Sequence, residues 1–380
     1  MSLLIKNGTV IDPKNNLSEV MDIFVCDGKI RQVDKSIKDF GKDSVDKIID
    51  ASGLFIFPGL IDLQVHFREP GREDRETLET GSRAALAGGI TSVVTMPNVT
   101  PVADNQTVIE FILKRAKELN LINIYPAGSI TKNQEGKTLS EINELKQSGA
   151  IAVTDDGSDV QDEGLLKRAF EYAKTVDLLV MSHCETKDLT EEGVMHEGWV
   201  STQLGLPGIP ATSEDMAVYK NIILAEEIGA RLHLLHNSTA GAIRAIREAK
   251  KRAEKNGIKT ITAETCVQHF ALTDEECLGY NTNAKMYPPL RSQEHVEAVI
   301  EGLKDGTIDA ITTDHAPHIE PDKLKAFQDA AMGTVGLETS LAASYTALVI
   351  PEHLSMSQLI EKMSLAPARI LRIEKTKGHL

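Results

Sequence analysis

The chain is organised around residues 59–71, which read GLIDLQVHFREPG. Apolar and polar side chains alternate through this stretch, with Ile61, Leu63 and Val65 on one side and Asp62, Gln64 and His66 on the other. A two-residue period predicts a β-strand, and the following Pro70-Gly71 predicts a loop. Such a strand can present its polar groups together at one edge of a sheet. A strand with one face in water has the same pattern, so the choice depends on the rest of the chain.

Further apolar runs of strand length follow, separated by amphipathic stretches of helical length. Together with residues 55–66, the strand candidates are residues 90–96, 122–127, 150–154, 178–182, 231–235, 260–264 and 309–313. The helical candidates are residues 73–87, 106–119, 139–147, 163–174, 213–228, 241–255 and 293–303. Eight alternations of strand and helix predict an α/β fold, a (β/α)8 TIM barrel rather than an open doubly wound sheet.

The first 54 residues differ from the rest, because short strand-like runs and turns such as Asn7-Gly8 and Asp27-Gly28 dominate them. We predict that residues 1–54 form the N-terminal part of a small β-sandwich domain, since they are too few to bury much core alone. The barrel is expected at residues 55–372. Residues 373–380 would begin a return to the small domain, whose C-terminal part we expect to be missing.

The composition is that of an ordinary globular enzyme, with 380 residues, 41% hydrophobic and 26% charged. A formal net charge of −15 argues against binding to nucleic acid or to an anionic membrane surface. The N-terminus does not resemble a signal peptide, and no apolar run reaches membrane-spanning length. Four separated cysteines, Cys26, Cys184, Cys266 and Cys277, predict free thiols in a reducing compartment, so a cytoplasmic location is expected.

Active sites of such barrels lie at the C-terminal ends of the strands. The polar residues at those positions are Asp62, Gln64, His66, Arg68, Asn98, Asp155, Asp156, His183, His236, Thr265, Cys266, Asp314, His315 and His318. The histidines and aspartates among them suit zinc or a similar divalent metal, which would lower the pKa of a bound water to about 7. Each residue alone is more often structural, but their conjunction at five strand ends favours a metal site. His196, His233, His295, His353 and His379 lack this placement, and we expect them to be structural.

These motifs resemble those of the dihydroorotases of the amidohydrolase superfamily, over residues 3 to about 372. The motifs are PGLID with HFREPG in residues 58–71, Met96-Pro97-Asn98, TDDG at 154–157, His183-Cys184-Glu185, HNST at 236–239, PPLR at 288–291 and TDHAPH at 313–318. Arg68 and Asn98 in particular favour a dihydroorotase over a hydantoinase or an allantoinase.

The resemblance implies a site of one or two zinc ions. His66 and Asp314 would hold one ion, His183 and His236 a second, and Asp156 would bridge them. Arg68, Asn98 and His318 would bind the substrate carboxylate, and Asp314 would act as the catalytic proton shuttle. The implied reaction is the reversible hydrolysis of dihydroorotate to N-carbamoyl-aspartate in pyrimidine biosynthesis. A homodimer is expected, with aspartate carbamoyltransferase as a candidate partner.

Three positions depart from the family pattern. Gln64 stands where a histidine is usual, Tyr287 where an asparagine that contacts the substrate ring is expected, and Gln268 in a step that is usually Pro-His-His. A neutral amide is a poorer zinc ligand than imidazole. Three hypotheses therefore stay open: an active dihydroorotase, a dihydroorotase-like chain with weak or no activity that scaffolds aspartate carbamoyltransferase, and a hydantoinase- or allantoinase-type enzyme.

Overall fold

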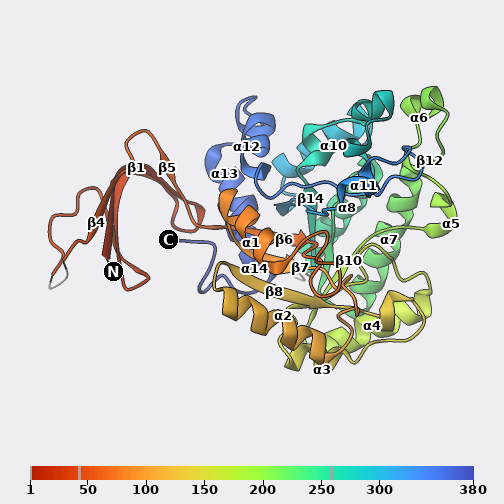
Figure 1. Cartoon of the computed structure of the whole chain (residues 1–380), viewed down its shortest axis with the longest axis horizontal. Coiled ribbons are helices and arrows are strands. Elements are labelled where there is room, and N and C mark those ends of the chain that lie inside the picture. Colours follow the sequence, from red (N-terminus) through yellow and green to blue (C-terminus); the bar gives the residue numbers. More distant parts are fainter. Residues whose placement is uncertain (1, 42–43, 257–259) are drawn as a thin grey trace. The chain divides into compact units, whose positions relative to one another are not determined.

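The computed structural model describes residues 2–41, 44–256 and 260–380, and it divides into two compact units (Figure 1). One unit comprises Met1–Leu60 and Leu354–Leu380, and the other comprises Ile61–His353. Across the described residues, every helix is too short or too polar to cross a membrane. The four cysteines are free thiols, as predicted, and all are buried.

The larger unit is built on an eight-stranded parallel sheet. Its strands are β6 (Leu60–Val65), β7 (Ile90–Thr95), β8 (Asn123–Gly128), β9 (Ala152–Val153), β10 (Leu179–Ser182), β13 (Leu232–Leu234), β14 (Ile261–Cys266) and β15 (Ala310–Thr312), and their spatial order follows the chain. The first and last strands meet where Val65 bridges to His315, and the backbone N–H of His66 donates to the carbonyl oxygen of His315 at 2.8 Å. The sheet therefore closes on itself, and the predicted barrel is confirmed.

A helix follows each of the first seven barrel strands, and these helices surround the strands in Figure 1. They are α1 (Leu78–Ala87), α2 (Gln106–Leu119), α3 (Ile142–Gln147), α4 (Glu163–Thr175), α7 (Ala211–Ile228), α8 (Ala240–Asn256) and α10 (Gln293–Lys304). Helix α1 begins five residues later than predicted, because Thr77 caps it. The Thr77 hydroxyl accepts from the Thr80 N–H at 3.0 Å, and the Thr80 hydroxyl accepts from the Thr77 N–H at 3.0 Å.

Shorter elements lie in the loops of this unit. They are η2 (Lys132–Gln134), α5 (Lys187–Thr190), β11 (Met195–His196), α6 (Trp199–Leu204), β12 (Gly208–Ile209), α9 (Gln268–Ala271), η3 (Asp274–Tyr280), η4 (Thr282–Ala284), α11 (Glu320–Lys323), α12 (Ser340–Ser344) and η5 (Tyr345–Val349). Most of them follow β10, β14 and β15, and strands β11 and β12 pair in parallel. The loops at the C-terminal ends of the strands are thus the most elaborate, which is where the site is expected.

Strand β6 shows why the alternation at residues 60–66 does not describe a surface strand. All six of its residues are buried, including the polar Asp62 and Gln64. A barrel strand has one face in the barrel interior and the other beneath the helices, so neither face meets water. Burying polar side chains is unfavourable unless they find hydrogen-bond partners. Asp62 and Gln64 therefore need such partners or a function in the barrel interior.

The smaller unit contains a five-stranded sheet. Its strands are β1 (Ser2–Asp12), β2 (Leu17–Cys26), β3 (Lys29–Asp34), β4 (Lys47–Asp50) and β5 (Phe55–Ile56), in the order β3-β2-β1-β4 with β5 also paired to β1. The unit also includes η1 (Pro13–Asn15), α13 (Met356–Ile360), η6 (Glu361–Leu365) and α14 (Ala366–Ile370). Helix α13 contacts β1 and η1. Residues 354–372, expected in the barrel, therefore belong to the unit of the N-terminal sheet, and the expected sandwich is one sheet with helical segments beside it in the described residues.

Candidate active site

Five predicted metal ligands meet at the C-terminal end of the barrel. They lie just beyond five different strands and are all buried: His66, Asp156, His183, His236 and Asp314. Their nitrogen and oxygen atoms form two groups within 4.8 Å, one of Asp156, His183 and His236 and the other of His66, Asp156 and Asp314. The structure therefore brings together the whole set that sequence reasoning selected.

Asp156 is common to both groups. Its Oδ2 lies 3.2 Å from His66 Nε2, and its Oδ1 lies 3.3 Å from His236 Nε2 and 3.5 Å from His183 Nδ1. His66 Nε2 is also 2.9 Å from Asp314 Oδ1. One carboxylate thus faces one group with each oxygen, the arrangement that a bridging ligand requires.

The backbone is strained at two of these residues. His236 has a φ of 31° and Asp314 a φ of 46°, in the left-handed region that residues other than glycine rarely adopt. Such conformations cost about 1–3 kcal/mol each and persist where the surrounding structure enforces them. Their occurrence at two strand ends of one cluster points to a functional demand on the directions of these side chains.

In this cluster, the carboxylates favour the protonated forms of the histidines, and the histidines favour the ionised form of Asp156. Burial and the charge of Arg68 lower the pKa of His66, but hydrogen bonds to Asp156 and Asp314 outweigh them and raise it to about 9. Burial also opposes the charge of His183, yet its carboxylate partners raise the pKa to about 10. Burial raises the pKa of Asp156, and the three histidines outweigh it and hold the pKa well below its usual value. The same positions suit a divalent cation, which competes with protons for imidazole nitrogens.

The donor set fits such a cation. Imidazole nitrogens and carboxylate oxygens are the usual ligands of zinc and related metals. The two ring nitrogens His183 Nδ1 and His236 Nε2 converge to 2.8 Å beside the same Asp156 oxygen. Asn98 fixes the remaining histidine, because its Oδ1 accepts from His66 Nδ1 at 2.8 Å and leaves His66 Nε2 facing Asp156 and Asp314. Asn98 thus has a contact within the cluster that sequence reasoning did not foresee.

Gln64 points at the same cluster. Its Nε2 donates to Asp156 Oδ1 at 3.1 Å, and its Oε1 is buried and lacks a hydrogen-bond partner in the described part of the chain. A buried unsatisfied polar atom costs about 1–3 kcal/mol. The position that holds a histidine in the family pattern therefore does face the centre, and it offers an amide there.

A cavity of about 210 Å³ opens beside the cluster, large enough to hold several waters. Four cluster residues and all three predicted substrate-binding residues line it: His66, Asp156, His183, Asp314, Arg68, Asn98 and His318. Tyr287, Ala316, Met332 and the glycines Gly157 and Gly333 complete the wall. The predicted substrate-binding and metal-binding residues thus share one cavity.

Arg68 brings a buried positive charge to this cavity. Burial lowers the pKa of its guanidinium to about 10, so the group is still charged at neutral pH. Its Nε is buried and has no hydrogen-bond partner among the residues that the structure describes. A desolvated guanidinium with an unpaired donor favours an anionic ligand, and carboxylates can accept two parallel hydrogen bonds from it.

His318 reaches the cavity in its neutral form. Its Nε2 donates to the carbonyl oxygen of Met332 at 2.8 Å, and burial together with Arg68 lowers its pKa to about 4. Its Nδ1 is buried and, within the described residues, without a partner. As placed, Nδ1 would accept a hydrogen bond from an N–H group, whereas binding a carboxylate would require His318 to take up a proton.

Two lysines that sequence reasoning missed hold the loop behind this wall. Lys285 Nζ donates to the carbonyl oxygens of residues 327, 328 and 330 at 2.7, 2.9 and 2.8 Å. Lys323 Nζ donates to the carbonyl oxygens of residues 285, 331 and 333 at 3.2, 3.0 and 3.0 Å. The loop that carries Met332 and Gly333 is therefore held at five carbonyl oxygens between residues 327 and 333. No local pattern in the sequence signals these contacts.

The other strand-end candidates have structural partners. Asp62 accepts from the Thr313 hydroxyl at 2.6 Å, and burial raises its pKa to about 7. Asp155 accepts from the backbone N–H groups of residues 130 and 131 at 2.8 and 3.0 Å, the local role that a turn aspartate often has. His315 Nε2 contacts Glu76 at 2.9 Å. Gln268 donates to the carbonyl oxygen of residue 313 at 3.1 Å, so this departure from the family pattern supports the backbone beside Asp314.

Histidines outside the cluster also have partners elsewhere. His233 pairs with Glu264 at 2.9 Å inside the barrel, where burial lowers the pKa of His233 to about 3 and raises that of Glu264 to about 8. Their contact is thus a hydrogen bond between neutral groups at pH 7. His196 and His295 pack edge to face at 5.4 Å between ring centroids.

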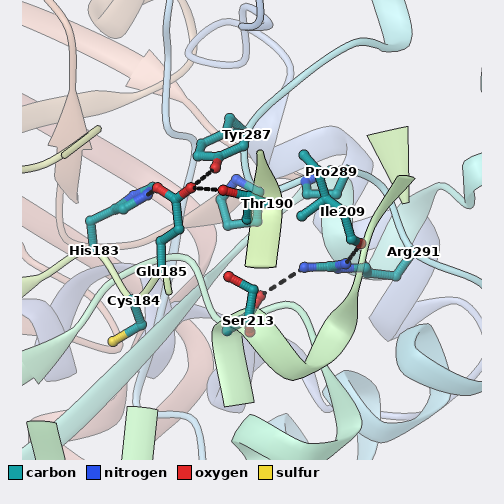
Figure 2. A pocket seen from close by; sticks show the side chains of 11 residues that line it. His183, Cys184, Glu185, Thr190, Ile209, Ser213, Tyr287, Pro289 and Arg291 are labelled. Atoms are coloured by element: carbon teal, nitrogen blue, oxygen red, sulfur yellow. Dashed lines mark hydrogen bonds and ion pairs between the residues drawn. The ribbon is translucent and has the colours of Figure 1, made fainter. Parts of the chain in front are cut away.

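Two further side chains contact His183: Glu185 faces the ring nitrogen opposite the one that faces Asp156, and Tyr287 stacks on the ring. The rings of Tyr287 and His183 stack with centroids 5.6 Å apart and an interplanar angle of 18°. The Tyr287 hydroxyl donates to Glu185, and Glu185 Oε2 lies 3.5 Å from His183 Nε2. Figure 2 shows this arrangement in the small pocket next to the cavity. Sequence reasoning used Glu185 only as part of a motif and did not expect this contact.

Comparison with known proteins agrees with this geometry. The family described as dihydro-orotase-like matches residues 53–242. The dihydroorotase of Syntrophus aciditrophicus is 49% identical over 375 residues, which cover 99% of this chain and 86% of the relative, and that of Pelotomaculum thermopropionicum is 50% identical over the same shares.

Solved structures show the same fold. The L-hydantoinase (dihydropyrimidinase) from Arthrobacter aurescens has a TM-score of 0.83 and 25% identity, and the match covers 100% of this chain and 84% of that one. The dihydropyrimidinase from Brevibacillus agri NCHU1002 has a TM-score of 0.81 at 21% identity, covering 100% and 83%. The structural matches establish the amidohydrolase barrel, and the nearly full-length sequence matches are more specific. The chain belongs to the dihydroorotase family.

Proposed function

We propose that this protein is an active, metal-dependent dihydroorotase that opens and closes the cyclic amide between dihydroorotate and N-carbamoyl-aspartate. The observation that carries the proposal is the shared cavity: a buried guanidinium with an unpaired donor, Arg68, lines the same space as a buried imidazole–carboxylate cluster. Dihydroorotate combines the two groups that such a cavity would recognise, a ring carboxylate and a cyclic amide. The dihydroorotases at about half identity over nearly the whole chain support the same assignment.

We infer that zinc is the metal. His66, Asp156 and Asp314 would hold one ion, and Asp156, His183 and His236 a second. When bound, the metal would polarise the amide carbonyl and supply a water whose pKa is lowered to about 7. The choice of zinc rests on the mixture of nitrogen and oxygen ligands, which it accepts readily.

The residues of the chain would divide the remaining work. Arg68 would bind the ring carboxylate with two parallel hydrogen bonds and so orient the amide toward the cluster. Asp314, on the cavity wall, would accept the proton of the attacking water and deliver it to the ring nitrogen that leaves. Asn98 and His318 would complete the recognition of the ring, with His318 Nδ1 facing an N–H group or, once protonated, the carboxylate.

The two other hypotheses are less well supported by the site. A hydantoinase does not require a carboxylate on the ring, so a buried guanidinium without a protein partner at Nε would have no obvious use. An inactive scaffold would not need five buried residues whose ligand atoms form two groups, each within 4.8 Å. Activity measurements on the three kinds of substrate distinguish these hypotheses.

The test is to measure metal content and turnover of the same preparation. The purified full chain, reconstituted with zinc, should bind at least one ion and act on dihydroorotate and N-carbamoyl-aspartate in opposite directions, with little turnover of hydantoin or allantoin. Failure to bind zinc, or turnover of hydantoin alone, would overturn the proposal. Light scattering of the chain, alone and mixed with aspartate carbamoyltransferase, tests the expected homodimer and the candidate partner.

A further inference from the structure

Glu185 is the centre of a small hydrogen-bonded group next to the cluster. Its carboxylate accepts from the hydroxyl of Tyr287 and from Thr190 Oγ1, the latter at 2.6 Å. Figure 2 shows the three side chains converging, with His183 beside them. Glu185 and Thr190 are buried, and Tyr287 is partly buried. Two hydroxyl donors therefore fix the position of this carboxylate.

The carboxylate faces His183 on the side opposite the cluster. Glu185 Oε2 lies 3.5 Å from His183 Nε2, while His183 Nδ1 points to Asp156 and His236. His183 Nε2 is buried and has no hydrogen bond within the described residues at this separation. An approach of a few tenths of an ångström would make a hydrogen bond in the ordinary range.

The chemistry of imidazole gives this geometry a meaning. A neutral histidine carries one N–H, so it can bind a metal through Nδ1 only if the proton is on Nε2. An acceptor at Nε2 fixes that tautomer, orients the ring and makes the ligand more basic. The Tyr287 ring, stacked on His183 at 18°, restricts the plane of the imidazole at the same time.

We propose that Glu185 and Tyr287 are positioning residues for His183: Glu185 accepts a hydrogen bond from its Nε2–H, and Tyr287 holds both the carboxylate and the plane of the ring. The inference rests on the proposed function, because it takes His183 as a metal ligand. Tyr287 also lines the substrate cavity, so the same side chain touches the space where the substrate would bind and the support of one ligand. Tyr287, which departs from the family pattern, thus has a function in this chain.

The test measures zinc binding to the apo full chain in competition with a fluorescent chelator, and the visible spectrum of the cobalt-loaded protein. Glu185→Gln removes the charged acceptor, and we expect zinc affinity to fall 10- to 100-fold at the site of His183, as for other outer-shell partners of metal-bound histidine. Tyr287→Phe keeps the stacked ring and loses the hydroxyl, so a smaller loss and a shifted cobalt spectrum are expected.

Two matched variants serve as controls. Glu191→Gln removes an exposed carboxylate from the same loop region, and Tyr280→Phe removes a hydroxyl that donates to the carbonyl oxygen of residue 204 at 3.0 Å on the surface. Both should bind zinc like the wild type. If Glu185→Gln and Tyr287→Phe also bind zinc like the wild type, with an unchanged cobalt spectrum, the positioning role is refuted while the proposed function stands. If the wild type itself binds no zinc, the proposed function fails and this inference with it.

Discussion

Replacing Arg68 by lysine tests the substrate site most directly. The guanidinium is buried in the cavity wall, and its Nε has no hydrogen-bond partner in the described part of the molecule. Lysine preserves the positive charge but cannot make two parallel hydrogen bonds to one carboxylate. Arg68→Lys should therefore lose one charge-assisted hydrogen bond to the substrate and leave the metal cluster unchanged.

The magnitude follows from that single bond. A hydrogen bond to a charged group contributes about 1.5–3 kcal/mol, and each 1.4 kcal/mol is a factor of ten. The KM for dihydroorotate should thus rise about 10- to 150-fold, with a smaller effect on kcat. Arg68 is already buried in the free protein, so substrate binding removes little water from it. The lost hydrogen bond is therefore not offset by a smaller desolvation cost in the variant.

The assay compares two substrates, dihydroorotate and dihydrouracil, which has the same ring without the carboxylate. Arg68→Lys should lower kcat/KM for dihydroorotate and leave kcat/KM for dihydrouracil nearly unchanged. Arg72→Lys is the control, because Arg72 pairs with Asp74 at 3.2 Å near the surface. Equal losses on both substrates, or an unchanged KM for dihydroorotate, would refute the assignment of Arg68 to the carboxylate.

Three further changes have defined outcomes. Gln64→His should add a nitrogen ligand beside Asp156 and raise the number of zinc ions per chain, and turnover should rise only if that ion limits the wild type; an unchanged zinc content would show that residue 64 does not bind metal. Burial raises the pKa of Glu264 from 4.5 to about 8, so between these pH values the native state keeps a proton that the unfolded chain loses. The stability that the protonated carboxyl contributes is complete below pH 4.5 and is lost as the pH rises to 8. The Glu264→Gln side chain stays neutral at every pH. The free energy of unfolding of this variant, measured in urea, should therefore rise relative to that of the wild type between pH 5 and pH 8, by at most about 1.4 kcal/mol per pH unit. A difference between the two proteins that does not change with pH would contradict the raised pKa. Lys323→Met should free the carbonyl oxygens behind the cavity wall, speed limited proteolysis at residues 324–333 and raise the KM for dihydroorotate more than it lowers kcat; unchanged proteolysis would exclude a role in holding the loop.

Hydrophobic periodicity predicted the barrel because it depends on local sequence. The eight strands and seven main helices were found where the apolar runs and amphipathic stretches placed them. The start of α1 was missed because the reciprocal hydrogen bonds of Thr77 and Thr80 outweigh the helical pattern before them. Residues 354–372 were assigned to the barrel from the extent of the family resemblance, which does not reveal which unit a segment packs against.

The site could be predicted as far as the strand ends determine it. His66 and Asp314 lie side by side as expected, because all strands of a parallel barrel end on one face. The contacts of Glu185, Lys285 and Lys323 depend on the conformations of long loops, which no period in the sequence describes. Asn98 was assigned to the substrate alone, and its hydrogen bond to His66 emerged only from the geometry.

The seam of the barrel bears on the order in which the site assembles. His66 and Asp314 are 248 residues apart in the chain and meet only where the first strand joins the last. The other group draws on β9, β10 and β13, which are neighbours in the sheet. A folding chain could therefore complete the Asp156–His183–His236 group before closure, whereas the His66–Asp156–Asp314 group must wait for it. A metal bound by His66, Asp156 and Asp314 would link the first strand of the barrel to the last, so that part of its binding energy would stabilise the closed barrel.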